Sequence, residues 1–384
     1  MEIYTLDSLY RRTAVIDKFK SILWVDRFVP LGDFELIVQS TREMQNLLQI
    51  DTRLACDVSH TVMIIESYED DEEQGLLTVK GHSLEQILDD RAAMGSLDDL
   101  TTTPKWTITD APADIGRKIF HDICVTGILD PNDVIPFIIE GTFMPEDTLP
   151  EPSDDITMEM DPTTVYNALK SLSETYDFGF RMLRQFDSSQ IYFDIYMGSD
   201  RTTGQTTLPA VVFSKDLDNL FNVKELKVIT NAKNVAYVFS PADTAIVYPP
   251  DVDPSVEGFE RRVLVVVASD ITSDNPDVAG ALYQRGQEEL AKVRVTQAFD
   301  GEISQTTQFK PGRDYNLGDL VEMRNDDGSS NRMRVTEMIF AEDGEGERAY
   351  PTLALNTFVS AGSWLSMGTT EWADMDAETW EEMP

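Results

Sequence analysis

The sequence predicts an α+β fold that is rich in β-structure. Three observations lead to this prediction: short apolar or alternating stretches dominate the chain, a few segments have helical periodicity, and two distant segments share one strand pattern. With 384 residues the chain is long enough for two or three domains. Hydrophobic residues make up 41% of it, which is enough to build buried cores.

The first domain is expected over residues 1–95, as a β-domain that ends in a helix. Short strands are expected at residues 22–25, 34–39, 53–56, 62–67 and 76–80. The acidic run Glu69–Glu73 lies between the last two strands. Its carboxylates are contiguous rather than alternating, so a solvated hairpin tip is favoured over a calcium site. Ser83 and Gln86 form a capping-box pattern, which predicts a helix to about Ala93.

Residues 96–220 are expected to form a middle region that contains helices. Its first part, residues 96–110, is polar and rich in threonine, which indicates a loop. Isoleucines spaced four apart predict a helix over residues 112–124, and Asp161 with Pro162 is expected to cap another helix to about Tyr176. The remaining expectations are a proline-rich linker at 145–162 and strands at 179–183, 191–196 and 211–213.

A second β-domain is expected over residues 221–360. Residues 223–230 and 234–239 alternate in polarity and predict one hairpin. The proline-rich stretch 241–260 indicates a long loop. Asp277 is placed to cap the strongest helical pattern of the chain, at 278–294. Further strands are expected at 262–269 and within 295–358.

Two distant segments of these β-domains share one layout. Residues 51–79 and 318–355 each have the pattern of a strand, a short polar turn, a strand, an acidic turn and a strand. Any three-stranded meander gives a similar pattern, so the likeness alone leaves a duplication open. A duplication would give the chain two barrel-like β-domains, one near each end, with other material between them.

The chain ends in an acidic tail over residues 361–384. The tail carries Trp364, Trp372 and Trp380, which are spaced by eight residues. On a helix this spacing returns to within about 80° of the same face. The tail is therefore interpreted either as a docking peptide with apolar anchors or as a frayed terminus, and the sequence favours neither.

The formal net charge of −38 excludes a nucleic-acid-binding surface of the usual basic kind. The longest apolar runs are too short to span a bilayer, and the N-terminus lacks the order of a secretory signal, so no stable membrane association is expected. Cys56 and Cys124 are interpreted as buried reduced thiols. The spacing of His60, His82 and His121 matches no metal-binding motif, and no cofactor is expected.

Catalytic motifs are not found in the sequence. It contains neither a GxSxG nucleophile elbow nor a GxxxxGK[ST] loop. Carboxylate pairs such as Asp89 with Asp90 are frequent, but among 69 acidic residues some pair meets any distance rule by accident. The chain is therefore expected not to be an enzyme, and a glycan hydrolase remains the alternative.

Several segments together resemble a minor tail protein family of siphophages that infect actinobacteria. No single segment is a chemical motif, but their order and spacing are specific, and they cover most of residues 4–358. The acidic loops and the tail lie outside the resemblance. The matching segments are 13–17 (TAVID), 23–27 (LWVDR), 32–36 (GDFEL), 81–91 (GHSLEQILDDR), 283–290 (YQRGQEEL), 314–320 (DYNLGDL), 334–337 (RVTE) and 350–353 (YPTL).

The resemblance implies a baseplate or tail-tip hub, similar to the central hub of contractile tails. Such hubs are homotrimeric rings in which each protomer carries two related β-barrel domains with inserted helix-containing domains. Three protomers then present six similar barrels to a sixfold tail tube. The resemblance further implies no enzymatic role for this part of the chain. Some relatives carry lysin or glycan-binding extensions, which are not expected here.

The expected role is therefore a structural one in the virion, at the tail tip, after synthesis in the host cytoplasm. The hub would close the tube and form a channel for DNA, which it contacts only in transit. Expected partners are a distal tail protein ring, tail-tip or receptor-binding proteins and the tape measure protein. A receptor-binding module is a further alternative. The candidate interface residues are Val62, Ile64, Leu320, Val335, Trp364, Trp372 and Trp380.

Overall fold

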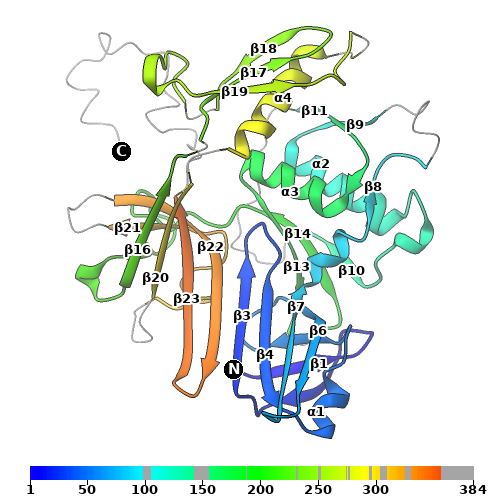
Figure 1. Cartoon of the computed structure of the whole chain (residues 1–384), viewed down its shortest axis with the longest axis vertical. Helices are drawn as coiled ribbons and strands as arrows, with labels where there is room; N and C mark the ends of the chain where they lie inside the picture. The colour runs from blue at the N-terminus through cyan, green and yellow to red at the C-terminus, as the bar shows by residue number, and fades with distance from the viewer. Residues whose placement is uncertain are drawn as a thin grey trace.

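A computed structural model of the chain gives the fold (Figure 1). It describes residues 1–97, 105–141, 155–186, 188–230, 232–249, 252–273, 275, 277–293, 296–302, 309–324 and 330–355. The tail with its three tryptophans lies outside these residues, and so do most of the 145–162 stretch and part of the 96–110 stretch.

The fold is organised around one sheet of 13 strands. Hydrogen-bonded neighbours follow the order β16-β20-β23-β22-β3-β4-β7-β6-β5-β1-β2, with β21 beside β22 and β15 beside β21. The strands are β1 (Ile3–Leu6), β2 (Arg12–Ile16), β3 (Ser21–Arg27), β4 (Asp33–Gln39), β5 (Arg53–Cys56), β6 (Met63–Asp71), β7 (Leu76–Ser83), β15 (Val212–Phe213), β16 (Phe221–Val228), β20 (Thr296–Glu302), β21 (Leu320–Arg324), β22 (Ser330–Asp343) and β23 (Gly346–Leu355).

The smaller sheets and the longer helices lie beside one end of this sheet, whereas the short helix α1 lies at the opposite end (Figure 1). The smaller sheets contain β8 (Ala92–Ala93) with β12 (Thr163–Thr164), β9 (Trp106–Asp110) with β11 (Ile156–Met160), β10 (Ile138–Glu140) with β14 (Ile191–Tyr196) and β13 (Gly179–Arg184), and β18 (Thr244–Val247) with β17 (Val235–Phe239) and β19 (Val263–Val267). The helices are α1 (Arg42–Leu47), α2 (Pro112–Phe120), α3 (Val165–Tyr176) and α4 (Val278–Ala291), with a π-helical turn at His121–Thr126 and 3₁₀ turns at Leu84–Leu88, Pro131–Asp133, Lys215–Leu217 and Gly258–Glu260.

Three apolar cores follow from the periodicity of the elements. In β4, every second residue (Phe34, Leu36 and Val38) is buried, so one face of the strand joins the core of the large sheet. In α3, Val165 and Leu169 lie on one stripe and join the core of the middle region. The third core lies where α4 packs on β17 and β18.

Many of the predicted elements are present in the fold. The strands expected at 53–56 and 191–196 have those bounds. The helix expected at 112–124 is α2 together with the π-helical turn that follows it. Asp277 caps α4 as expected, and its carboxylate accepts the Gly280 N–H. Both meanders of the shared layout are present, as β5-β6-β7 and β21-β22-β23.

Four local predictions are wrong, because tertiary contacts override local pattern. Ser83 does not cap an α-helix: it ends β7, its hydroxyl accepts the Gly32 N–H at 3.0 Å, and only a 3₁₀ turn follows. The helix expected from Asp161 begins instead after Thr164, whose hydroxyl accepts the Asn167 N–H. Strands β9 and β18 lie in stretches that were predicted as loops.

A fifth prediction, the hairpin expected at 223–239, is also wrong. The two strands are present, but they belong to different sheets: β16 pairs with β20, whereas β17 pairs with β18 and β19. Alternation of polarity predicts a strand but not its partner. Partner choice here depends on residues that lie more than 60 positions further along the chain, in β20.

Candidate functional site

The most informative feature of the fold is a repeated unit of five strands. We call β3–β7 the N-terminal unit and β16 with β20–β23 the C-terminal unit. Spatial order in the N-terminal unit is β3-β4-β7-β6-β5, and in the C-terminal unit it is β16-β20-β23-β22-β21. Each unit thus has the same order of strands along the chain and the same order in space, with antiparallel pairing throughout.

The register of hydrogen bonds aligns the two units residue by residue. The middle strand of each meander carries one β-bulge toward its third strand, at Glu66 in β6 and at Thr336 in β22. A row of paired residues beside the bulge crosses four strands of each unit. The rows are Ile65, Gly81, Phe34 and Trp24 in the N-terminal unit and Val335, Leu353, Phe299 and Glu225 in the C-terminal unit. Shared bulges at matching positions support a common origin of the two units.

The two units meet where β22 pairs with β3. Residues Glu337–Glu342 of β22 pair antiparallel with Arg27–Ile22 of β3, so the two units share one continuous sheet. Trp24 is fully buried at this junction, opposite Phe340, and its ring lies 6.0 Å from the ring of Phe34. Burial of these large side chains is the main source of free energy at the junction.

An open pocket of about 670 Å³ lies at the junction, between the two units and the middle region. Two carboxyl groups on its lining, those of Asp26 and Glu85, are almost fully buried. Burial raises the pKa of Asp26, and hydrogen bonds from Ser59 and Trp24 oppose this shift only in part. Burial raises the pKa of Glu85 too, and its carboxylate accepts the Met182 N–H.

These carboxyl groups could transfer protons in principle, because perturbed groups in a pocket are typical of catalytic sites. The contacts favour a structural role instead. Asp26 accepts the Trp24 indole N–H at 3.1 Å and the Ser59 hydroxyl at 2.6 Å, and so ties β3 to the loop before β6. Glu85 ties the 3₁₀ turn after β7 to β13 of the middle region.

A buried arginine connects the C-terminal unit with the middle region. Arg334 of β22 donates hydrogen bonds to the carbonyl of Gly318 at 2.6 Å, the carbonyl of Met197 at 2.7 Å and the carboxylate of Asp177 at 2.6 Å. Close by, Asp319 pairs with Arg201 at 2.7 Å, and both side chains are buried. These polar contacts fix the orientation of the unit, because a guanidinium that satisfies several acceptors tolerates little displacement.

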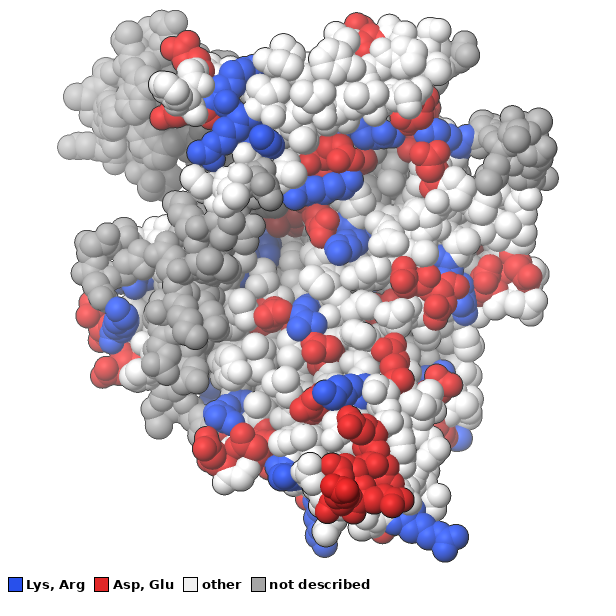
Figure 2. Space-filling model, in the orientation of Figure 1, with Lys and Arg blue, Asp and Glu red and all other residues white. Residues whose placement is uncertain are grey.

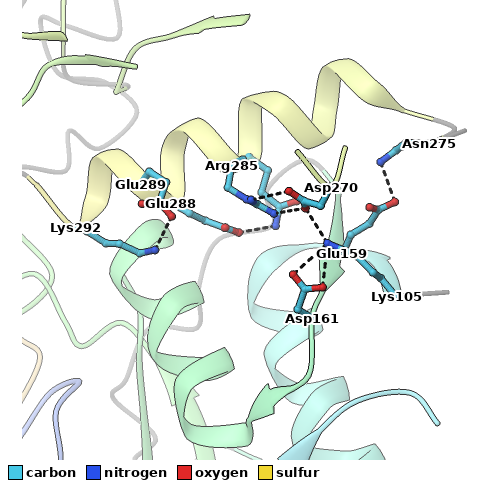
Figure 3. Close-up of polar contacts among 10 residues, drawn as sticks. Lys105, Glu159, Asp161, Asp270, Asn275, Arg285, Glu288, Glu289 and Lys292 are labelled. Atoms are coloured by element: carbon cyan, nitrogen blue, oxygen red, sulfur yellow. Dashed lines mark hydrogen bonds and ion pairs between the residues drawn. The ribbon is translucent and has the colours of Figure 1, made fainter. Parts of the chain in front are cut away.

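The insertion that holds β17–β19 and α4 docks on the middle region through ion pairs (Figure 3). Asp270 accepts hydrogen bonds from Lys105 at 2.8 Å and from Arg285 of α4 at 2.8 Å. Lys105 also pairs with Asp161 at 3.1 Å. Burial alone would raise the pKa of Asp270, but the bonds from Lys105 and Arg285 outweigh it and lower the pKa to about 2.

The structure places the four described candidate interface residues in or beside the two meanders. Val62, just before β6, and Val335, beside the bulge of β22, are fully buried within the chain. Ile64 and Leu320 are half-buried; Ile64 is the second residue of β6 and pairs with Arg53, and Leu320 is the first residue of β21 and pairs with Arg334. The structure does not bring the four together, and their partner role stays a prediction. Trp364, Trp372 and Trp380 lie outside the described residues.

Sequence reasoning missed the residues that organise the junction. Asp26 directly follows the apolar run 22–25, and an acid inside a β-rich segment is the one signal that could have drawn attention to it. Nothing in the local pattern distinguishes Arg334, Lys105 or Asp270, because their partners lie more than 15 residues away or in another element. Such contacts become visible only in three dimensions.

Within the described part of the chain, no helix has the length and apolar character needed to cross a membrane. In the same residues, His, Cys, Asp and Glu side chains form no group of three or more that could hold a metal ion.

Comparison with known families decides which proteins these units belong to. Residues 1–352 match the family described as Siphovirus ReqiPepy6 Gp37-like protein. The chain belongs to this family. The match includes both five-strand units almost completely, since only the last residues of β23 lie beyond it. The resemblance to siphophage tail proteins that the sequence predicted is thereby confirmed.

Solved structures with a similar fold include several tail proteins. The tail protein from Neisseria meningitidis MC58 has a TM-score of 0.56 and 13% identity, over 95% of this chain and 98% of its own. The 43 kDa tail protein of prophage MuSo2 from Shewanella oneidensis has a TM-score of 0.54 and 14% identity, over 93% and 98%. A prophage tail protein from Listeria monocytogenes EGD-e has a TM-score of 0.54 and 11% identity, over 94% and 96%. No curated protein matches the chain in sequence. The fold is thus that of phage tail proteins, β-rich with few helices.

Proposed function

We propose that this chain is the structural hub of a non-contractile phage tail tip. It forms a homotrimeric ring that closes the distal end of the tail tube and surrounds a channel for DNA ejection. The proposal assigns it no catalytic step. In the virion it contacts a ring of distal tail protein above, tail-tip or receptor-binding proteins below, and the tape measure protein.

One observation carries this proposal: the chain contains the five-strand unit twice. Three copies of a chain with two units present six similar units, which suits a sixfold tube. A hub of threefold symmetry can then meet a tube of sixfold symmetry without a gap in the contacts. The strand pairing of the described residues does not itself close either unit into a barrel, so closure into barrels belongs to the proposed assembly.

The negative net charge of the chain supports the proposed channel for DNA. Three copies carry a formal charge of 3 × −38 = −114. Acidic side chains that face a channel repel the phosphates of DNA and keep it from adhering as it passes. Figure 2 shows that acidic side chains are spread over the visible face and gather in one patch at the lower end of the large sheet.

The test is the oligomeric state of the full chain and its place in the virion. At micromolar concentration in solution, alone or with the distal tail protein, we expect the chain to form an assembly that contains three copies. We also expect threefold density at the end of the tail tube when virions are imaged. The proposed hub function would be refuted by a chain that stays monomeric both alone and with the distal tail protein, or by density at the tail tip without threefold symmetry.

A further inference from the structure

The outer half of β6 has an edge that no described strand covers. Residues Ser67–Asp71 pair with β7 on one side. On the other side β5 reaches only Met63 and Ile64. An uncovered edge presents backbone N–H and C=O groups that another strand can pair with. The side chains of Glu66, Ser67 and Glu69 along this edge are exposed.

The matching edge in the C-terminal unit is covered. The bulges align Ser67–Asp71 of β6 with residues 337–341 of β22. These residues of β22 pair with β3, which is the first strand of the N-terminal unit. The chain therefore contains one example of the contact that β6 lacks: the middle strand of one unit paired with the first strand of the other.

The first strand of the C-terminal unit, β16, has an uncovered edge as well. Among the described strands it pairs with β20 alone and ends the large sheet. By register it is the counterpart of β3, since Glu225 and Trp24 hold the same position in their rows. Thus, among the described strands, the outer half of β6 has no first strand of a unit paired beside it, and β16 has no middle strand of a unit paired beside it. The two uncovered edges complement each other, but they lie on different units of one chain.

We propose that β16 of a second copy pairs antiparallel with the outer half of β6, in the register of the junction between β22 and β3. This pairing rests on the hub function proposed above and names the surfaces that form the ring. Since Ile339 pairs with Val25 at the junction, the same register sets Glu69 opposite Leu226 of the second copy. Each copy uses a different edge for each neighbour, and three copies close a ring in which junctions within chains alternate with junctions between chains.

The difference in net charge makes β16 a better partner for the edge of β6 than a second β6. The edge of β6 and its turn carry six acidic residues between Glu66 and Glu73, and the acidic patch in Figure 2 lies where the β6–β7 hairpin ends. The sequence of β16 contains Lys224 and Lys227. In the proposed register Asp71 meets Lys224 and Tyr68 meets Lys227, whereas Asp70 meets Glu225. Two copies of the acidic edge repel each other, so the acids also select β16 over a second β6.

Disulfide trapping in the full chain tests the register. We expect the double variant Glu69→Cys with Leu226→Cys to form covalent dimers and trimers upon mild oxidation, because directly opposed residues of paired strands lie within disulfide reach. The matched control is Glu69→Cys with Thr230→Cys, which is displaced by four residues, or roughly 13 Å, and should form at least tenfold less covalent product. The native Cys56 and Cys124 are buried and contribute little background.

The outcomes separate this proposal from the hub itself. A trimer that yields covalent product with the registered pair and not with the control supports the pairing. A trimer that yields none with the registered pair, or equal amounts with both pairs, overturns the pairing and leaves the hub standing. A chain that stays monomeric with its distal tail partner overturns both. The mass of each reduced variant, measured first, shows that the substitutions leave the assembly intact.

Discussion

The two five-strand units differ in continuity along the chain. The N-terminal unit runs without interruption over residues 21–83, whereas the C-terminal unit spans residues 221–355 and contains an insertion between its first two strands. The insertion, with β17–β19 and α4, leaves the order of pairing unchanged. It enters at the connection between β16 and β20, where a longer loop costs little entropy and breaks no ladder. The comparison teaches that the register of hydrogen bonds, and not continuity in sequence, defines the unit.

The units differ also in what fills matching positions of their sheets. Trp24 of the N-terminal unit corresponds to Glu225, and Gly81 corresponds to Leu353. Trp24 lies at the junction within the chain, where β22 covers it. The C-terminal counterpart lies on an edge strand, and no described strand pairs with its outer side. A position covered within the chain takes a large apolar residue, and its uncovered counterpart takes a charged one.

The largest expected effect comes from removing the tryptophan at the junction. Trp24→Ala should lower the free energy of unfolding by about 4 kcal/mol, because it leaves a cavity beneath Phe340 and frees Asp26 from its indole donor. Urea unfolding followed by circular dichroism, at fixed protomer concentration, measures this loss. The control Val15→Ala lies on a half-exposed edge position and should cost less than about 0.5 kcal/mol. Equal losses for both variants would show that the junction does not hold the units together.

A smaller loss of stability is expected from a substitution at Gly81, which lies beside the bulge of β6 and corresponds to Leu353 of the C-terminal unit. A Cβ atom at Gly81 would lie 1.8 Å from the carbonyl oxygen of Ile64, in the backbone of the neighbouring strand. Gly81→Ala should therefore cost about 3 kcal/mol of unfolding free energy, since backbone atoms must shift to admit one methyl group. The matched control is Gly344→Ala in the β22–β23 turn, where a Cβ meets no atom within 4 Å. We expect this control to change the midpoint in urea very little. If Gly81→Ala leaves the free energy of unfolding unchanged, the backbone at the bulge of β6 moves to admit the methyl group.

The sequence predicts the elements of this fold better than their partners. The strands expected at 191–196, from alternation, and at 53–56 have the observed bounds of β14 and β5, and the cap at Asp277 placed the start of α4. These features depend on neighbours within a few residues. The hairpin assigned to β16 and β17 failed because β17 belongs to the insertion, which forms a sheet of its own, and local pattern carries no information about where an insertion begins.

The candidate site was predicted in outline and not in its residues. The shared strand layout located both meanders, because a strand, a polar turn and an acidic turn are all local signals. The junction that the repeat implies depends on Trp24, Asp26 and Arg334, whose roles arise from contacts with distant elements. A buried aspartate in a strand looks the same in sequence as an exposed one, so only the fold distinguishes them.

The smallest expected effect concerns the insertion that distinguishes the C-terminal unit. The pKa of Asp270 in the folded chain, about 2, lies below the ordinary value of 3.8, so its ion pairs stabilise the docked insertion above about pH 4 and lose this effect as the pH falls toward 2. Asp270→Asn should weaken docking of the insertion by up to about 2 kcal/mol at pH 7. Because amides of α4 exchange when the insertion opens, this loss corresponds to roughly thirtyfold faster amide exchange in α4. Near pH 2.5 the difference between the variant and the native chain should shrink to about fourfold, after correction for intrinsic exchange, because part of the Asp270 carboxylate is then protonated. Glu289→Gln, which removes an exposed pair with Lys292 on the same helix, is the control and should change exchange less than threefold. A difference between Asp270→Asn and the native chain that persists unchanged at low pH would show that the insertion docks through packing rather than through this carboxylate.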